Sequence, residues 1–476
     1  MALNDSSRSA SSTSGASFDS FPSVFSLPSS QSATWLVTTT VILVTLLILE
    51  QSVYRYKKRH LPGDKWTYSY HWQPTMEGYM RQWNSGALSA ISVFNIFIVM
   101  ASSTEVFLTG KEHVDYRRSL NALFTRKAIG MYVAIQDVIT RQHFKEWLAE
   151  AAKDPSPKPI MMTARHLNMD TSLRVFCGNY IPEHATREIS EKYWAITLAL
   201  ELVNFPLALP GTKIYKAIQS RKVAMYWLEL AAASSKAAMA KGGEPACLLD
   251  EWVRILQDPS WKGRRDFSNH EMAMVIFSFL FASQDAMSSG LIYGFQHLAD
   301  RPDILAKVRE EQERVRQGNY DAPLTIEMMD EMPYLQAFVK ESMRIKPPVT
   351  MVPYKTTKAF PIANDYTVPA GSMIIPSFYN ALHDSEVFPD PDALQPERWL
   401  DPQSSANTNP KNYLVFGAGP HKCIGLEYAM MNIALVLGTA AVMFDWEHDV
   451  TPKSEQVEII ATLFPKDGCR LKLTPR

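Results

Sequence analysis

The sequence predicts one large, mainly α-helical domain with small β-sheets, behind an N-terminal transmembrane helix. Three observations support this fold class. Helical periodicity dominates the 476 residues, extended segments are few and short, and an uncharged apolar run lies near the N-terminus. No internal repeat divides the chain further. We therefore expect a disordered serine-rich N-terminus at residues 1–32, a membrane anchor at 33–52 and a single domain at 53–476.

The anchor prediction depends on the run from Ala33 to Leu49, which contains no charged residue and, at 17 residues, is short for a helix that spans a bilayer. Residues 1–32 are rich in serine and poor in large apolar side chains, a composition typical of disorder. The cluster Lys57, Lys58 and Arg59 follows the run, so the positive-inside rule puts the domain in the cytoplasm. The alternative is a cleaved signal peptide, but its positive charge would precede the apolar run.

Composition limits the partners and the compartment. The formal net charge of −1 argues against a nucleic-acid partner. The four cysteines are widely spaced and form no CxxC motif, which disfavours a disulfide framework or a zinc module and is typical of a reducing compartment. They are Cys177, Cys247, Cys423 and Cys469.

Four short segments have the character of β-strands. They are Leu88–Phe94, Ile96–Met100, Tyr366–Val368 and Ser372–Ile375. Turn signals at Asn364-Asp365 and Ala370-Gly371 punctuate the last two, and the pattern as a whole predicts small sheets.

The apolar run Met272–Phe281 predicts a helix through the core of the domain. Ten apolar residues cannot span a bilayer. Polar residues follow, among them Asp285, and burying them is costly unless they meet partners or a cavity. The alternative is a helix that emerges into solvent after Phe281, but Leu291 and Phe295 argue against it.

Glu341 and Arg344 lie three residues apart, which puts opposite charges on one helical face before Pro347-Pro348 ends the helix. Taken alone, such a pair is most often found on the surface.

The stretch Phe416–Gly425, with the sequence FGAGPHKCIG, places Cys423 in a glycine-rich loop that precedes an apolar, helix-like segment. Backbone N–H groups at a helix N-terminus stabilise a thiolate, and glycines allow close approach to a flat ring. These properties suit a cysteine that binds haem iron, where the thiolate pushes electron density into the metal. Phe416 can cover the sulfur. A buried structural cysteine in a turn is the alternative.

The full pattern Phe-Gly-x-Gly-x-His-x-Cys-x-Gly resembles the haem-binding loop of the cytochrome P450 family. The resemblance implies the fold of that family, a haem b cofactor and Cys423 as the iron ligand. It also implies that Glu341 and Arg344 join Arg398, in the segment Pro396–Trp399, as a buried structural network. The residues expected to contact haem are His113, Arg117, Lys355, Phe416, Gly417, His421, Cys423 and Gly425. Arg117 and His421 would face the haem propionates, and His113 replaces a tryptophan of the family pattern.

Within that family the chain resembles the fungal sterol 22-desaturases of ergosterol biosynthesis. The segments that carry this resemblance include Phe279–Asp285, Pro347–Lys355, Asp445–His448 and Ser119–Lys127. It implies introduction of the C-22(23) double bond into a sterol side chain, with electrons from NADPH delivered by NADPH–cytochrome P450 reductase. It further implies a single-pass protein of the endoplasmic reticulum membrane.

The same resemblance assigns roles to further residues. Asp285 is the candidate for proton delivery, and because Ala286 follows it where many relatives have threonine, Ser288 or Ser289 could take part. A sterol pocket should be apolar. The candidates for its lining are Phe281, Ala282, Val349, Met351, Val352 and Leu463.

One departure from the family concerns the region after Ser103. Residues 95–103 run almost directly into 104–110, whereas relatives have a helix and a long loop of roughly 30 residues between these elements, a length typical of functional loops. A missing segment would open the pocket to water. Two alternatives therefore remain open: a haem- or sterol-binding protein without activity, and a hydroxylase acting at another sterol position.

Overall fold

The computed structural model describes residues 30–58, 110–199, 209–260, 266–350, 352, 354–363, 366–460 and 462–476. The chain divides into two compact units, Met1–Lys65 and Trp66–Arg476. The predicted strands Leu88–Phe94 and Ile96–Met100, the shortened region after Ser103 and residue Met351 lie outside the described residues.

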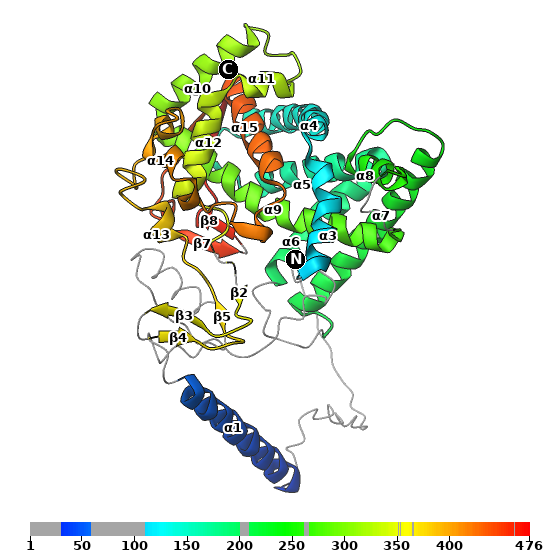
Figure 1. Ribbon diagram of the computed structural model, residues 1–476, viewed down its shortest axis with the longest axis vertical. Helices are drawn as coiled ribbons and strands as arrows, with labels where there is room; N and C mark the ends of the chain where they lie inside the picture. The colour runs from blue at the N-terminus through cyan, green and yellow to red at the C-terminus, as the bar shows by residue number, and fades with distance from the viewer. Residues whose placement is uncertain are drawn as a thin grey trace, which may run out of the picture. The chain divides into compact units, whose positions relative to one another are not determined.

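In the first unit, helix α1 spans Ser30–Lys58, so it begins before the expected anchor and continues past it (Figure 1). Three hydroxyl side chains on this helix donate to the carbonyl four residues earlier, Thr38 to Thr34, Thr45 to Val41 and Ser52 to Ile48. These bonds satisfy the hydroxyl donors within the helix itself.

The second unit is mainly α-helical, as the sequence predicts. Its longer helices are α3 (Gly110–Asn121), α4 (Arg126–Lys153), α5 (Met161–Cys177), α6 (Glu183–Ala199), α7 (Lys213–Ala240), α8 (Leu248–Gln257), α9 (Asn269–Asp300), α10 (Pro302–Arg316), α12 (Pro333–Ile345) and α15 (Leu426–Met443). Shorter helices are α11 (Ile326–Asp330), α13 (Tyr379–Leu382) and α14 (Ser405–Thr408), with 3-10 turns at Ala122–Phe124, Gly178–Tyr180, Pro396–Trp399, Pro410–Asn412 and Gly419–His421.

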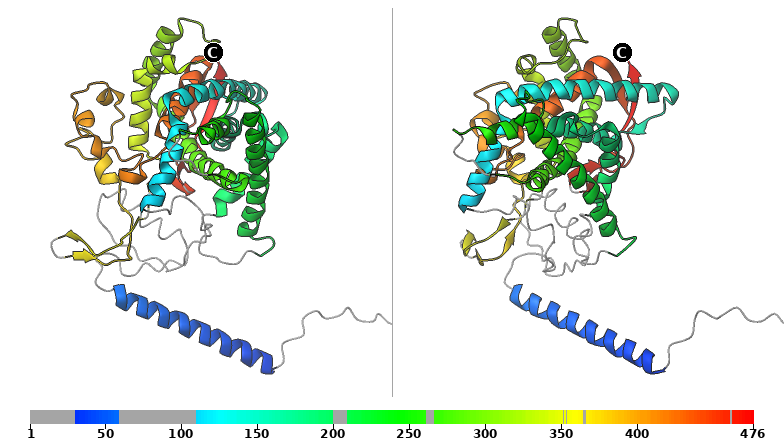
Figure 2. Two further views of the ribbon diagram at one scale, coloured as in Figure 1. Left: turned by 45° about the vertical axis from the view of Figure 1, so that its right-hand side comes forward. Right: turned by 90° about the vertical axis from the view of Figure 1, so that its right-hand side faces the viewer.

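The β-structure consists of small antiparallel sheets. Strand β9 (Arg470–Pro475) lies between β1 (Lys158–Pro159) and β6 (Phe444–His448). Three further pairs join β2 (Tyr354–Lys355) to β5 (Met373–Ile374), β3 (Phe360–Ala363) to β4 (Tyr366–Val368), and β7 (Val457–Ile460) to β8 (Thr462–Pro465). The predicted strand Tyr366–Val368 is confirmed as β4, and the predicted strand Ser372–Ile375 contains β5. Figure 2 shows the β3–β4 hairpin standing apart from the helices in both views.

Four helices pack side by side around a shared interior: α4 contacts α5 and α15, and α9 contacts the same two helices (Figure 1). Helix α9 begins with a capping box, in which the hydroxyl of Ser268 accepts from the backbone N–H of Glu271 and the Glu271 carboxylate accepts from that of Ser268. The helix continues to Asp300, and Leu291 and Phe295 are fully buried. The interpretation that it emerges into solvent after Phe281 is therefore wrong.

Within the described residues, α9 and α15 are long and apolar enough to cross a membrane. Most of each helix is buried inside the domain, so we interpret both as core helices. In α1 the apolar stretch that stands out is the shorter segment Val37–Leu46.

Helices α9 and α15 approach closely because two glycines of α9 meet two large side chains of α15. A Cβ atom added to Gly290 would lie 2.9 Å from Cδ1 of Ile433, and one added to Gly294 would lie 2.6 Å from Cδ1 of Leu437. Both pairs are spaced by four residues, so they lie on one face of each helix. This contact fixes α9 relative to the start of α15, where the Cys423 loop ends.

Candidate active site

The Cys423 loop is closed by backbone hydrogen bonds. The N–H of Cys423 donates to the carbonyl of Phe416 at 2.9 Å, and that of Gly417 donates to Leu414 at 2.8 Å. Gly417 and Gly419 have φ angles of 69° and 70°, in the left-handed region that favours glycine. The glycines of the motif therefore allow the loop to fold back just before α15 begins at Leu426.

The Cys423 side chain reaches the surface of the chain, while protein atoms crowd it from the other side. This crowding raises the pKa of the Cys423 thiol. The backbone N–H of Gly425 and the positive charges of Arg117 and Lys422 act in the opposite direction, because they stabilise the thiolate. The loop therefore holds an accessible sulfur whose pKa stays raised by burial, although Arg117, Lys422 and the Gly425 N–H partly offset this rise.

Helix α3 is attached to this loop through two residues on one of its faces. Arg117 donates a hydrogen bond to the carbonyl of Lys422, the residue before Cys423. One turn earlier, the ring of His113 stacks on that of His421, with centroids 4.0 Å apart. Burial lowers the pKa of His113, and the charges of His421 and Arg117 lower it further. The structure thus brings together four of the residues expected to contact haem: His113, Arg117, His421 and Cys423.

The residues of the loop fit a flat group with a single protein ligand to its metal. A Cβ atom added to Gly417, Gly419 or Gly425 would meet no atom within 4 Å, so the loop presents an open face. In the described part of the chain, no group of three or more His, Cys, Asp or Glu side chains could hold a metal ion. A lone accessible cysteine, flanked by Arg117 and two histidines, matches the donor set that haem with propionates requires.

Glu341, Arg344 and Arg398 form a fully connected buried network, so the surface interpretation of Glu341 and Arg344 is wrong. Arg344 donates to Glu341 twice, from Nε and from Nη2, each at 2.9 Å, and Arg398 Nε donates to Glu341 Oε1 at 2.9 Å. Trp399 Nε1 donates to Oε2 at 2.9 Å. The Glu341 and Arg344 side chains are 0% exposed. The network ties α12 to the turn Pro396–Trp399.

Lys340 strengthens the same region from the neighbouring position on α12. Its Nζ lies 3.8 Å from the ring centroid of Trp399 and 5.2 Å from that of Tyr413. Burial lowers the pKa of Lys340. Such cation–π contacts hold the segment before the Cys423 loop against α12.

Asp285 lies in the interior of the domain and is fully engaged. Arg165 of α5 donates to its Oδ1, and Thr197 of α6 donates to its Oδ2 at 3.1 Å. The guanidinium of Arg165 also lies 4.4 Å from the ring centroid of Trp194. Burial lowers the pKa of Arg165 to about 10, so the guanidinium stays charged at neutral pH. Three helices therefore meet at the carboxylate of Asp285.

The two serines after Asp285 have different partners. Ser288 donates to the carbonyl of Gln284 at 2.6 Å and accepts from Nδ2 of Asn168 at 2.9 Å. Ser289 donates to the carbonyl of Leu463 at 2.5 Å, and the N–H of Leu463 in turn donates to Pro348. Leu463, a predicted pocket residue, is thus held against α9 and is almost completely buried.

The other predicted residues are more exposed. Ala282 is exposed in the middle of α9, and Phe281 and Ala286 on either side are partly exposed. Val349 and Val352 are partly buried. Lys355 is exposed on β2, where it is paired in register with Met373. Exposure of Ala282 between the buried stretches 272–276 and 287–296 marks a face of α9 that the described side chains leave uncovered.

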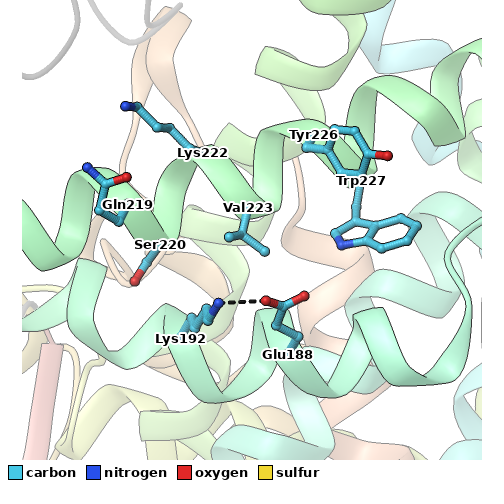
Figure 3. A pocket seen from close by; sticks show the side chains of 8 residues that line it. All are labelled: Glu188, Lys192, Gln219, Ser220, Lys222, Val223, Tyr226 and Trp227. Carbon is cyan, nitrogen blue, oxygen red and sulfur yellow. Dashed lines mark hydrogen bonds and ion pairs between the residues drawn. The ribbon is translucent and has the colours of Figure 1, made fainter.

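A separate open cavity of about 460 Å³ lies along α6 and α7 (Figure 3). Lys192 and Glu188 form an ion pair on its floor with an N–O distance of 2.5 Å. Its lining residues are Glu188, Lys192, Gln219, Ser220, Lys222, Val223, Tyr226 and Trp227. None of them is among the predicted site residues, and we assign no chemistry to this cavity.

Sequence reasoning missed Arg165 and Thr197 as the partners of Asp285. One signal for Arg165 exists: together with Asn168 and Ser172 it forms a polar stripe along one face of its helix. A polar stripe on α5 that matches polar residues of α9 could have indicated that the two helices pair. Thr197 carries no comparable signal.

The chain belongs to the cytochrome P450 family, whose model matches residues 94–473. The predicted fold of the domain is thereby confirmed, together with a haem-thiolate centre as its cofactor class. The solved structure of retinoic-acid-bound cyanobacterial CYP120A1 shares this fold, with a TM-score of 0.67 and 22% identity over 80% of this chain and 83% of that one.

Among curated proteins, the chain is similar to C-22 sterol desaturases. It is 42% identical to ERG5A of Gibberella zeae, covering 85% of this chain and 84% of that one. It is 38% identical to ERG5 of Saccharomyces cerevisiae, covering 91% and 89%. The predicted resemblance to sterol 22-desaturases is therefore confirmed.

The alignment with the Gibberella zeae protein also bears on chain length. The alignment has 451 positions, and it includes 85% of this chain, or about 405 of its 476 residues. About 46 positions therefore hold a residue of the relative and none of this chain. Gaps of this total length agree with the prediction that an internal segment of the relatives is missing here.

Proposed function

We propose that this chain introduces the C-22(23) double bond into the side chain of a sterol in ergosterol biosynthesis, as a haem-thiolate oxidoreductase. The observation that carries the proposal is the accessible sulfur of Cys423 in its glycine-rich loop, in a chain about 40% identical to curated C-22 sterol desaturases. Bound haem would supply the oxygen activation that an unactivated C–H bond requires.

In this proposal the residues around Cys423 bind the haem cofactor. Cys423 would bind the haem iron through its sulfur, and Arg117, His113 and His421 would meet the propionates. Phe416, Gly417 and Gly425 would form the loop surface against the ring, and Lys355 would be a further cofactor contact. The Glu341 network holds the segment that leads to the loop.

The substrate side of the proposal uses α9 and the segments packed against it. Phe281, Ala282, Val349, Val352 and Leu463, with Met351, would line an apolar pocket for the sterol. Ser289 positions Leu463 through its hydrogen bond to the Leu463 carbonyl. Asp285 would hold and transfer a proton at its carboxylate, with Ser288 next to it on the same helix. Electrons would come from NADPH through NADPH–cytochrome P450 reductase.

We further propose that α1 anchors the chain in the endoplasmic reticulum membrane, with the catalytic domain in the cytoplasm. Trp35, Val41 and Leu49 are exposed on this helix, and three of its hydroxyls bond to its own backbone. A helix with satisfied polar groups and exposed apolar side chains suits a lipid environment. Alkaline carbonate should leave the full chain in the membrane fraction, and protease added outside sealed microsomes should degrade the domain. Extraction by carbonate would contradict the anchor.

The activity is tested by reconstituting the full chain with the reductase, NADPH and an ergosta-type sterol that lacks a 22,23 double bond. We expect a 22,23-alkene, and we expect the reduced protein with carbon monoxide to show the Soret shift of a thiolate-bound haem. Cys423→Ser should lose both. An alcohol product would instead support the hydroxylase, and an intact spectrum without product would support a non-catalytic binding protein.

A further inference from the structure

The interior shared by α4, α5, α9 and α15 contains polar side chains where a helical bundle usually has apolar ones. Each helix contributes two of them, spaced by four residues and therefore on one face. On α4 they are Gln136 and Thr140, and on α15 they are Tyr428 and Asn432. All four residues are at most 3% exposed. We call these four residues, together with the two on α5 and the two on α9 that are described next, the polar seam.

On α5 the corresponding residues are Asn168 and Ser172, and on α9 they are Gln284 and Ser288. Asn168 donates to Ser288 at 2.9 Å, and Gln284 Nε2 donates to the carbonyl of Arg165 at 2.7 Å. These bonds use only part of the capacity of each amide. The carbonyl oxygens of Asn168 and Gln284 have no partner among the residues that the structure describes.

On the α4 and α15 side of the seam, more polar atoms lack a hydrogen-bond partner. Both polar atoms of Gln136, both of Asn432, the hydroxyl of Thr140 and that of Tyr428 make no hydrogen bond within the described chain. A buried polar group without a hydrogen-bond partner is destabilising, so a cluster of this kind is expected to bind ordered water. Burial raises the pKa of Tyr428 to about 12, while Ser172 and Gln136 counteract part of this rise. Ser172 and Gln136 therefore lie close enough to the Tyr428 hydroxyl to stabilise its ionised form, although neither meets the geometry of a full hydrogen bond to it.

The seam meets α9 at one point beside the exposed Ala282. The hydroxyl of Ser172 lies 3.2 Å from that of Ser283, which is partly exposed and directly follows Ala282. At the opposite side, Asp137 is adjacent to Gln136 and lies one turn before Thr140. Its carboxylate accepts from Nε of the partly exposed Arg141 at 2.9 Å. The seam thus lies between the ion pair of Asp137 with the partly exposed Arg141 and the uncovered face of α9.

We propose that the polar seam binds a file of ordered water molecules and delivers protons from solvent to the active site through Ser172 and Ser283, by a route separate from Asp285. This inference rests on the proposed function, because that reaction consumes protons together with the electrons from NADPH. Each water or hydroxyl accepts one proton on an oxygen lone pair and releases another, so each carrier keeps its number of protons and regains its starting orientation by rotation. The amides of Gln136, Asn168, Gln284 and Asn432 position the waters and are not themselves carriers.

The first test is structural and needs no turnover. A high-resolution crystal structure of the haem-loaded chain should show waters in the seam, each bonded to polar groups of at least two helices. A seam without ordered water overturns the proposal.

The second test compares Ser283→Ala with Ser278→Ala, a matched control on the same helix whose hydroxyl bonds to the carbonyl of Met274. Ser283→Ala should slow product formation roughly tenfold or more, as expected for loss of a proton-transfer group, and should enlarge the solvent isotope effect. Ser172→Ala should do the same, and Ser283→Thr, which keeps a hydroxyl, should restore the rate. Equal behaviour of Ser283→Ala and Ser278→Ala overturns the relay.

Failure of the proposed function would look different, because the unmodified chain itself would then form no 22,23-alkene. Oxygen consumption driven by the reductase also takes up protons. The solvent isotope effect on oxygen consumption can therefore still be measured for Ser283→Ala and for Ser278→Ala. A larger effect in Ser283→Ala would support the relay, and equal effects would overturn it.

Discussion

Arg165 on α5 and Asp285 on α9 form an ion pair in the interior of the domain, where each residue is only 2% exposed. Thr197 of α6 donates to the second carboxylate oxygen at 3.1 Å, so the proposed proton-delivery residue also joins three helices. Structural and chemical roles of Asp285 must therefore be separated by experiment.

Asp285→Asn should slow sterol turnover about tenfold or more, because it removes the titratable group. It should also lower the free energy of unfolding by as much as about 3–5 kcal/mol, because Arg165 is left charged and buried without its partner. Urea denaturation and product formation measure the two effects. The double variant Arg165→Met with Asp285→Asn should recover most of the stability but none of the turnover. Recovery of turnover in the double variant would remove Asp285 from the chemistry.

Gly294→Ala should destabilise the domain by about 1–3 kcal/mol, because the added methyl group would overlap Leu437 and force α9 and α15 apart. Gly130→Ala is the matched control. It makes the same change within a long helix, but its Cβ would lie 3.4 Å from the nearest side-chain atom, in ordinary contact. Thermal or urea denaturation should show Gly130→Ala as neutral or stabilising, in line with the helix propensity of alanine. Equal effects of the two substitutions would contradict the close helix contact.

Glu341→Gln should cost about 3–5 kcal/mol and reduce the fraction of chains that take up haem, because Arg344 and Arg398 lose their shared negative charge in the interior. Glu397→Gln serves as the control. Glu397 pairs with Lys307 near the surface, where an ion pair contributes about 1 kcal/mol or less. Denaturation midpoints and the haem-to-protein absorbance ratio compare the two variants. A Glu341→Gln chain as stable as Glu397→Gln would show that the network does not support the fold.

His297 should make the stability of the domain depend on pH below neutrality. Burial lowers its pKa to about 4, from 6.5 in an exposed histidine. Between these two values the unfolded chain binds the proton and the folded chain does not, so the free energy of unfolding falls as pH decreases through this window. The loss over the full window is about 3 kcal/mol, and stability from this group is constant above it.

Urea denaturation across pH 4 to 6.5 measures this slope. His297→Gln should flatten it, whereas the same change at the exposed His270 should leave it unaltered. An unchanged slope in His297→Gln would assign the pH dependence to other groups.

Local patterns predicted the parts of this protein that depend on neighbours in sequence. The Cys423 loop, the β4 strand and the course of α9 through the core all follow from glycine placement, turn signals and apolar runs. Glu341 and Arg344 were correctly paired from their spacing, but burial of the pair was not predictable from spacing alone. Only the family resemblance linked Arg398 to them, since it lies 57 residues from Glu341.

The amino-acid order alone defines the cysteine, the loop that presents it and the helices that surround it, because these features arise within a few turns of the chain. Packing decides the rest. Arg165 becomes the partner of Asp285, and Gly294 becomes a contact with Leu437, only when helices more than a hundred residues apart are brought together. The polar seam likewise exists only in the assembled bundle. Each of the four helices supplies two polar residues, and these residues come together only when the helices pack.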